Sequence, residues 1–179
     1  MGIEPLLQSS SNEWATPQDL YDKLNSVFNF NLDPCSTHEN AKCENHYTIE
    51  DNGLDRSWNG VSFCNPPYGR ELPLWVQKAY EESVKGNKVV MLIPARPDTI
   101  YWHTYIFKYA KAVCFIKGRL HFGNAIHAAP FPSAIVVFQS ENLTQEQEDI
   151  LSSFGYYMSV SYRGPVRRTL NAETEDRSF

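Results

Sequence analysis

The residues in this sequence best suited to chemistry are Asn65-Pro66-Pro67-Tyr68, which follow an apolar run, Val61–Cys64, typical of a buried strand. Two successive prolines donate no backbone hydrogen bond and restrict φ, so the chain leaves the strand in a stiff, extended loop. The side-chain oxygen of Asn65 and the carbonyl of Pro66 can then accept two hydrogen bonds, which suits an exocyclic amino group with its two N–H donors. The ring of Tyr68 offers a face for stacking a flat base. An ordinary surface turn after a strand would carry similar residues, and that alternative stays open.

The surrounding pattern predicts an α/β sheet that places this loop at the carboxyl edge of its strands. Apolar residues at helical spacing predict helices over 17–27, 72–85, 101–109 and 144–154, and continuous apolar runs predict strands over 88–94, 112–116 and 134–138. A strand, a helix and another strand in succession form a parallel βαβ unit. Alternating residues predict a short strand over 28–32 that ends at Asp33, and 156–162 is expected to add an edge strand. We expect a mostly parallel sheet with an antiparallel edge and helices on both faces.

Length and composition limit the class of protein. The chain has 179 residues, 42% of them hydrophobic, which is enough for one buried core and too few for two sizeable domains. Its formal net charge is −5, so any nucleic acid must be bound by a local basic face rather than by overall charge. No apolar run approaches the roughly 20 residues of a membrane span, and the N-terminus has no basic region before an apolar stretch. We therefore expect a soluble, intracellular protein without a membrane partner.

The cysteines allow two interpretations. Cys64 and Cys114 lie inside predicted strands and are interpreted as core residues. The pairs Cys35-x-x-His38 and Cys43-x-x-His46 have the spacing with which proteins grip tetrahedral zinc, although the gap between the pairs is shorter than in zinc fingers. Our main interpretation contains no metal, and a structural zinc site is kept as an alternative.

Six short blocks, in one order along most of the chain, resemble the phage-type Dam family of DNA N6-adenine methyltransferases. The blocks are Trp14-Ala15-Thr16-Pro17, Asn31-Leu32-Asp33-Pro34-Cys35, Glu50-Asp51-Asn52-Gly53-Leu54 with Trp58, Asn65-Pro66-Pro67-Tyr68, Leu92-Ile93-Pro94-Ala95 and Gly118-Arg119-Leu120-His121-Phe122. The Asn65 block resembles the Asn/Asp-Pro-Pro-Tyr/Phe catalytic loop of amino-group methyltransferases. The resemblance implies a Rossmann-like methyltransferase sheet, S-adenosylmethionine as cofactor and double-stranded DNA as substrate. It also implies that Asn65, Pro66, Pro67 and Tyr68 act on an adenine flipped out of the duplex.

The resemblance further implies a cofactor pocket. The residues that it places there are Trp14, Thr16, Pro17, Asp33, Pro34, Cys35, Asn40, Asp51 and Asn65. The Asp33 carboxylate suits the methionine ammonium group, and that of Asp51 suits the adenine amino group. The family motif after Asp-Pro commonly continues into Gly-x-Gly, whereas residues 35–41 of this chain contain no glycine. Three structural alternatives therefore remain: Thr16 caps a helix, Asp33 caps a turn, and Asp51 lies in a solvated turn.

Basic residues next to aromatic ones, after two of the predicted strands, suit contacts with DNA. These residues are Arg96, Lys117, Arg119 and His121, with a surface charge or a hairpin turn as the alternative. We divide the chain into a flexible N-terminal segment, 1–13, a methyltransferase domain, 14–165, and a mobile tail, 166–179. The other functions considered are methylation of cytosine N4 or of a protein glutamine, and an inactive DNA-binding module. The recognition sequence and the oligomeric state, monomer or weak dimer, stay open, and a phage-encoded enzyme of this kind would act in the host cytoplasm.

Overall fold

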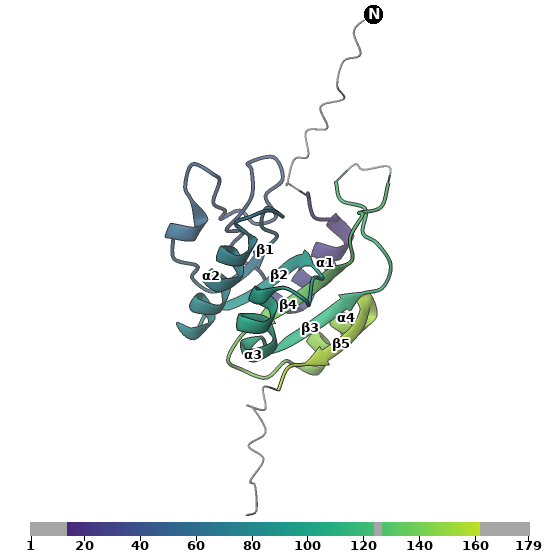
Figure 1. The fold of residues 1–179 in the computed structure, drawn as a ribbon. Helices are drawn as coiled ribbons and strands as arrows, with labels where there is room; N and C mark the ends of the chain where they lie inside the picture. Colours follow the sequence, from purple (N-terminus) through teal and green to yellow (C-terminus); the bar gives the residue numbers. More distant parts are fainter. Residues whose placement is uncertain (1–13, 124–126, 162–179) are drawn as a thin grey trace, which may run out of the picture.

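The computed structural model describes residues 14–123 and 127–161, and the predicted segments 1–13 and 166–179 lie outside these ranges. The chain forms helices and strands in a mixed order (Figure 1). The helices are α1 (Gln18–Phe28), η1 (Gly53–Asp55), α2 (Leu72–Val84), the π-helical η2 (Trp102–Ile106), α3 (Phe107–Tyr109) and α4 (Gln145–Phe154). The strands are β1 (Val61–Cys64), β2 (Lys88–Pro94), β3 (Ala112–Ile116), β4 (Ser133–Phe138) and β5 (Gly155–Ser159).

These strands form one mixed sheet in the order β1-β2-β4-β3-β5. The pairing of β1 with β2 is parallel, whereas β4 is antiparallel to both β2 and β3, and β5 is antiparallel to β3. An α/β fold was expected, but the prediction of a mostly parallel sheet with an antiparallel edge is wrong, because the antiparallel β4 lies in the middle. Every residue of β4 is buried. When a strand is buried on both faces, its apolar sequence does not show whether it runs parallel or antiparallel to its neighbours.

The strand directions bring three loops to one edge of the sheet. Because β4 is antiparallel to both β2 and β3, these two strands point the same way, and β1 is parallel to β2. The loops that follow β1, β2 and β3 therefore leave from the same edge, which confirms the predicted position of the Asn65 loop. In open α/β sheets this is the edge at which ligands bind.

The segment before Asp33 differs from the prediction. Residues 28–32 do not form a strand, because α1 continues to Phe28 and Asn29 ends it in the left-handed region, with φ of 55°. The Asn29 amide donates to the carbonyl of Asn25 at 3.0 Å, which closes the last turn. Leu32 and Asp33 then form isolated parallel bridges, to Ser62 of β1 and to His46. Asp33 thus lies beside β1, as expected from the sheet-edge argument.

Helices cover both faces of the sheet, as predicted. One core cluster contains apolar residues of α2 and η2, among them Trp75, Val76 and Trp102. The other contains apolar residues of α1 and α4, among them Leu24 and Leu151. Figure 1 shows the two helix groups on the two sides of the sheet. The sheet edge that carries the three loops is therefore supported from both faces.

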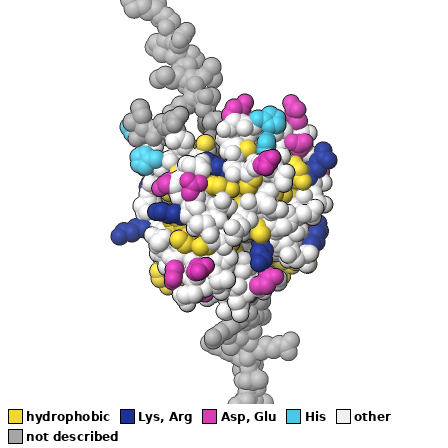
Figure 2. Space-filling view, turned by 180° about the vertical axis from the view of Figure 1, so that it is seen from behind, with side chains coloured by type: hydrophobic (Ala, Val, Ile, Leu, Met, Phe, Trp, Pro, Cys, Tyr) yellow, Lys and Arg dark blue, Asp and Glu magenta, His cyan; other side chains and the backbone are white. Residues whose placement is uncertain are grey.

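The molecular surface carries charges of both signs. Figure 2, seen from behind relative to Figure 1, shows acidic and basic side chains interspersed over one face rather than a single basic field. This distribution agrees with the formal net charge of −5. Within the described ranges, none of the helices has the length and apolar character that crossing a membrane requires.

Candidate active site

The side chain of Asn65 is held in one orientation by the segment that enters α1. Its Nδ2 donates to the carbonyl of Trp14 and to Oγ1 of Thr16, the latter at 2.9 Å. A carbonyl oxygen only accepts, so the amide nitrogen must face Trp14 and the amide oxygen must point away. The Thr16 hydroxyl therefore positions Asn65 and does not cap α1, whose N-cap is Pro17 without a side-chain cap.

The amide oxygen of Asn65 is buried and has no hydrogen-bond partner among the described residues. Within the same residues no hydrogen bond reaches the carbonyl of Pro66, whereas the carbonyl of Pro67 accepts from the Gly69 amide at 3.1 Å. A buried acceptor without a partner costs about 1–3 kcal/mol, and such atoms in a native fold call for a functional explanation. Neither acceptor that the sequence suggested is therefore used within the described part of the chain.

Asn65 lines a cavity of about 240 Å³ at this sheet edge. Of the nine predicted cofactor residues, seven line it: Trp14, Thr16, Asp33, Pro34, Cys35, Asn40 and Asn65. Pro17 and Asp51 do not, and among the predicted catalytic residues Pro67 lines the cavity while Pro66 and Tyr68 lie outside its wall. Asp51 instead accepts from the amide and hydroxyl of Thr48, at 2.9 and 3.0 Å. These bonds lower the pKa of Asp51 and close a turn whose neighbours do line the cavity.

The carboxylate of Asp33 is the buried charge of the cavity, with 4% of the residue exposed. Its two oxygens accept from the backbone amides of Cys35 and Lys42, at 3.2 and 3.0 Å. Burial raises the pKa of Asp33, and the two amide hydrogen bonds oppose that effect. A carboxylate has lone pairs for further donors, so a cationic group in the cavity would pair with Asp33 and stabilise its ionised form.

Tyr68 lies beside the cavity in a cluster of aromatic rings. Its hydroxyl donates to the carbonyl of Leu92 at 3.1 Å, and burial raises its pKa well above the ordinary value, so it stays protonated. The Tyr68 ring meets Phe122 and Phe131 edge to face, with centroids 6.1 and 5.4 Å apart. Both phenylalanines also contact the ring of Trp14. Aromatic faces thus lie next to the amide that carries the free acceptor.

A family model described as DNA N-6-adenine-methyltransferase (Dam) matches residues 5–154. The chain belongs to this family. Family membership confirms the resemblance seen in the sequence and assigns the protein to the DNA adenine methyltransferases.

Curated relatives carry related names. The DNA N-6-adenine-methyltransferase of Haemophilus phage HP1 (strain HP1c1) is 34% identical over 121 residues, which are 65% of this chain and 69% of the relative. The DNA N-6-adenine-methyltransferase of Escherichia phage T1 is 34% identical over 110 residues, 60% of this chain and 45% of the relative. The Putative methyltransferase YfdM of Escherichia coli (strain K12) is 37% identical over 70 residues, 35% of this chain and 77% of the relative.

In this Dam-family chain, the glycine that lets two backbone segments of the cavity wall come close together is Gly53, outside the segment 35–41. Residues 35–41 have no glycine, and Asn40 closes a turn there by accepting from the Thr37 amide at 2.7 Å. Gly53 instead packs against Pro34, and a Cβ at this position would lie 2.0 Å from the Pro34 carbonyl oxygen. Both residues line the cavity. The missing Gly-x-Gly is therefore compatible with a tight pocket wall.

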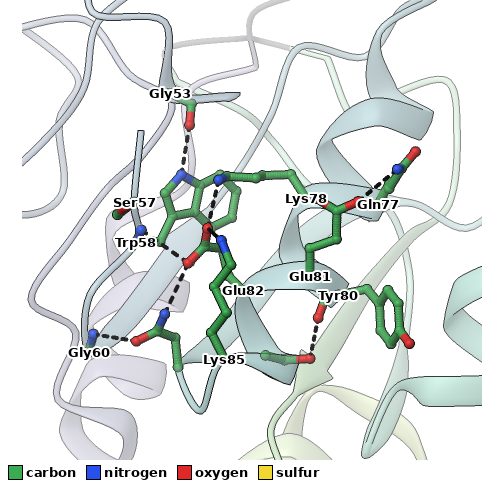
Figure 3. A network of polar contacts seen from close by, with 12 residues as sticks. Gly53, Ser57, Trp58, Gly60, Gln77, Lys78, Tyr80, Glu81, Glu82 and Lys85 are labelled. Carbon is green, nitrogen blue, oxygen red and sulfur yellow. Dashed lines mark hydrogen bonds and ion pairs between the residues drawn. The ribbon is translucent and has the colours of Figure 1, made fainter. Parts of the chain in front are cut away.

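A buried ionic network supports the Gly53 wall from behind (Figure 3). The indole nitrogen of Trp58 donates to the Gly53 carbonyl at 2.8 Å, and the Trp58 amide donates to Glu82 at 3.3 Å. Glu82 is fully buried and also accepts from Lys78 and Lys85, at 2.6 and 2.9 Å. Burial alone would raise its pKa, but the donors outweigh this effect and the pKa of Glu82 is lowered. The carboxylate therefore stays ionised and fixes Trp58.

Several cavity residues were not predicted as site residues from the sequence. They are Ala15, Ser36, Thr37, Lys42, Thr48, Ile49, Asn52, Gly53, Leu54, Glu71 and Trp75. Trp75 occurs at helical spacing with Leu72, Val76 and Ala79, so its pattern indicates only a core position. The one available signal was its place at the start of the helix that follows the Asn65 loop.

The predicted DNA contacts lie outside the cavity. Arg96 follows β2, and Lys117, Arg119 and His121 follow β3, and all four side chains are exposed. Because β2 and β3 point the same way, these cations leave the sheet at the edge that carries Asn65. Their exposure at this edge leaves the predicted contact with DNA open.

The four candidate zinc ligands have other contacts. The thiol of Cys43 lies 3.3 Å from the Tyr21 hydroxyl, and Nδ1 of His38 lies 2.9 Å from Nε2 of His46. Cys35 lies in the cavity wall. In the described part of the chain, no group of three or more His, Cys, Asp or Glu side chains is arranged to hold a metal ion.

Proposed function

We propose that this chain transfers a methyl group from S-adenosylmethionine to the N6 amino group of adenine in double-stranded DNA, on a Rossmann-like methyltransferase fold spanning 14–165. The observation that carries the proposal is the buried, unpartnered Oδ1 of Asn65, fixed at the wall of a cavity. Membership of the Dam family supports the reaction.

The proposed chemistry needs two acceptors for one nitrogen. The N6 amino group of adenine is a weak nucleophile because its lone pair is delocalised into the ring. Asn65 Oδ1 and the Pro66 carbonyl would accept hydrogen bonds from its two N–H groups, favour a tetrahedral nitrogen and stabilise the positive charge that develops as the nitrogen displaces the methyl group from sulfur. S-adenosylhomocysteine would leave, and one N–H proton would be lost to solvent. The contacts of Nδ2 with Trp14 and Thr16 keep Oδ1 in place throughout. Preorganised acceptors of this kind are the largest part of catalysis in many enzymes.

The cavity residues fit S-adenosylmethionine, which supplies an electrophilic methyl group when bound. Asp33 is a buried carboxylate with spare acceptor capacity, and it would pair with the methionine ammonium group. Trp14, Thr16, Pro34, Cys35 and Asn40 form the adjoining wall. In this proposal Pro17 and Asp51 do not contact the cofactor but hold residues that do. Pro17 starts α1, and Asp51 closes the turn at Thr48.

The substrate base must leave the duplex to reach Asn65. Extrusion of a base costs a few kcal/mol, which stacking on aromatic side chains offsets. Tyr68 and Phe131, which are only partly buried, supply such surfaces beside the amide, and the buried Phe122 packs against both. Arg96, Lys117, Arg119 and His121 hold the phosphates of the flanking strand.

Nucleoside analysis tests the proposed function. The protein is incubated with S-adenosylmethionine labelled in the methyl group and with unmethylated duplex DNA, which is then digested to nucleosides. Label in N6-methyldeoxyadenosine is the expected result. Label in N4-methyldeoxycytidine or in a protein glutamine would replace adenine as the substrate, and binding of DNA without any transfer would indicate an inactive DNA-binding module. Mapping the methylated adenines in a treated plasmid then gives the recognition sequence.

A further inference from the structure

Three of the cavity residues have a buried side-chain polar atom without a hydrogen-bond partner among the described residues. They are Asn65 Oδ1, Ser36 Oγ and Trp75 Nε1. The mechanism above uses Asn65 only. An indole N–H left unpaired in a native fold costs about 1–3 kcal/mol, so the donor on Trp75 requires an explanation that the core alone does not give.

The ring of Trp75 is packed closely between Trp58 and the turn at Gly53. The residue is 6% exposed and stacks on Trp58, with centroids 6.1 Å apart and an angle of 27° between the planes. Trp58 is itself fixed by its bonds to Gly53 and Glu82 (Figure 3). A Cβ at Gly53 would lie 3.2 Å from Cη2 of Trp75, so the turn lies close against the ring. The indole ring is therefore held at the cavity wall, and its N–H has no partner among the described residues.

An indole N–H only donates, so its partner in the cavity must be an acceptor. Trp75 shares its part of the wall with Gly53, beside Leu54 and Ile49, which together offer apolar surface to a flat ring. In the proposed site the ammonium group of the methyl donor would pair with Asp33 and carries no acceptor, and the methionine carboxylate, although it accepts, does not suit this apolar part of the wall. The purine and ribose supply ring nitrogens and oxygens that accept.

We propose that Trp75 is a cofactor-binding residue whose indole N–H donates a hydrogen bond to the adenosine portion of the methyl donor. This assignment rests on the proposed function of the cavity. The Glu82–Trp58 network then acts as the support that keeps the donor aimed into the cavity.

The test compares two tryptophan-to-phenylalanine variants of the full chain. W75F removes the indole N–H at the cavity, and W102F removes a buried indole N–H that does not line the cavity. Both substitutions keep an aromatic ring and lose the same volume. Calorimetry measures the affinity of each variant and of the wild type for S-adenosylhomocysteine and for 5′-methylthioadenosine, which lacks the amino-acid part.

We expect W75F to weaken the binding of both ligands by the same factor, about 3- to 10-fold for one hydrogen bond, and W102F to bind them as the wild type does. Equal affinities of W75F and the wild type would overturn the assignment. A loss seen with S-adenosylhomocysteine alone would move the contact away from the adenosine portion and overturn it as stated. If the wild type bound neither ligand, the proposed function of the cavity would fail instead.

A second measurement does not depend on the folding of a variant. The protein has four tryptophans, and their indole N–H resonances are followed in the wild type during titration with S-adenosylhomocysteine. A downfield shift of the Trp75 resonance is expected from a new hydrogen bond. A Trp75 resonance that does not move at saturation would contradict the assignment.

Discussion

Replacing Asn65 with aspartate tests whether the amide nitrogen of this residue is as necessary as its oxygen. Nδ2 donates to the Trp14 carbonyl and to Thr16 Oγ1. An ionised carboxylate at position 65 in N65D donates no hydrogen bond. The Thr16 hydroxyl can turn and donate to this carboxylate. The Trp14 carbonyl, in contrast, loses its donor and faces a negatively charged oxygen. One lost hydrogen bond and one unpaired carbonyl amount to about 2 kcal/mol of unfolding free energy at pH 7. The catalytic loop of amino-group methyltransferases has Asn or Asp, and these contacts select Asn.

The destabilisation of N65D should depend on pH. Repulsion by the Trp14 carbonyl raises the pKa of the introduced carboxyl in the folded state above the unfolded value of about 3.9. Below that value the acid is neutral in both states and can donate to Trp14, so the destabilisation is smallest there. It grows as the pH rises towards the folded pKa and is constant above it.

Urea unfolding of the wild type, N65D and N65A between about pH 4 and 8 measures this effect. N65A has no titratable group at this position, so its difference from the wild type should not change with pH. A stability difference for N65D that is absent, or that is the same across the pH range, would refute the assigned orientation of the amide.

Three further predictions follow from the pocket wall, the network and the sheet edge. G53A should weaken cofactor binding more than 10-fold because its Cβ would meet the Pro34 carbonyl, whereas G86A, at φ of +95° with no atom within 4 Å, should lower only the stability, by about 1 kcal/mol. E82Q should lower the unfolding free energy by about 2–3 kcal/mol because Lys78 loses its buried partner. Since the pKa of Glu82 is lowered by folding, this loss should be complete above about pH 4.3 and shrink as the pH falls through the folded value. R96A should weaken DNA binding and reduce the slope of log affinity against log salt by about 1.

Each of these has a result that would contradict it. The prediction for Gly53 would be wrong if calorimetry showed that G53A binds S-adenosylhomocysteine as tightly as G86A does. The prediction for Glu82 would be wrong if denaturant unfolding gave E82Q the same unfolding free energy as the wild type at pH 7. A salt titration of DNA binding with an unchanged slope would remove the Arg96 phosphate contact.

The sequence predicted the elements of the fold better than their directions. Helical spacing and apolar runs gave α1, α2, α4 and the central strands, because these patterns reflect burial directly. The direction of β4 could not be predicted because its residues are buried on both faces in either orientation. The strand expected over 28–32 did not form because α1 continues to Phe28, and Asn29 then ends the helix in the left-handed conformation while its amide closes the last turn.

The site divides in the same way. The sequence predicted the acceptor on Asn65, because two prolines constrain the loop whatever surrounds it. It gave no sign that Thr16 orients Asn65, since a threonine before a proline also fits a helix cap. Trp75 occupies a core position of α2, and it differs from the others by lining the cavity with an indole nitrogen that has no partner among the described residues.

The role of Asn65 Oδ1 is tested most directly by single-turnover methylation with N65A. Cofactor and DNA are saturating, the rate of transfer to adenine is measured, and S-adenosylhomocysteine affinity is measured in parallel. We expect the rate to fall by about 10²–10³-fold, with the affinity within about 3-fold of the wild type, because the lost acceptor acts in the transition state. A rate near that of the wild type, or a loss of affinity that accounts for the whole loss of rate, would contradict it.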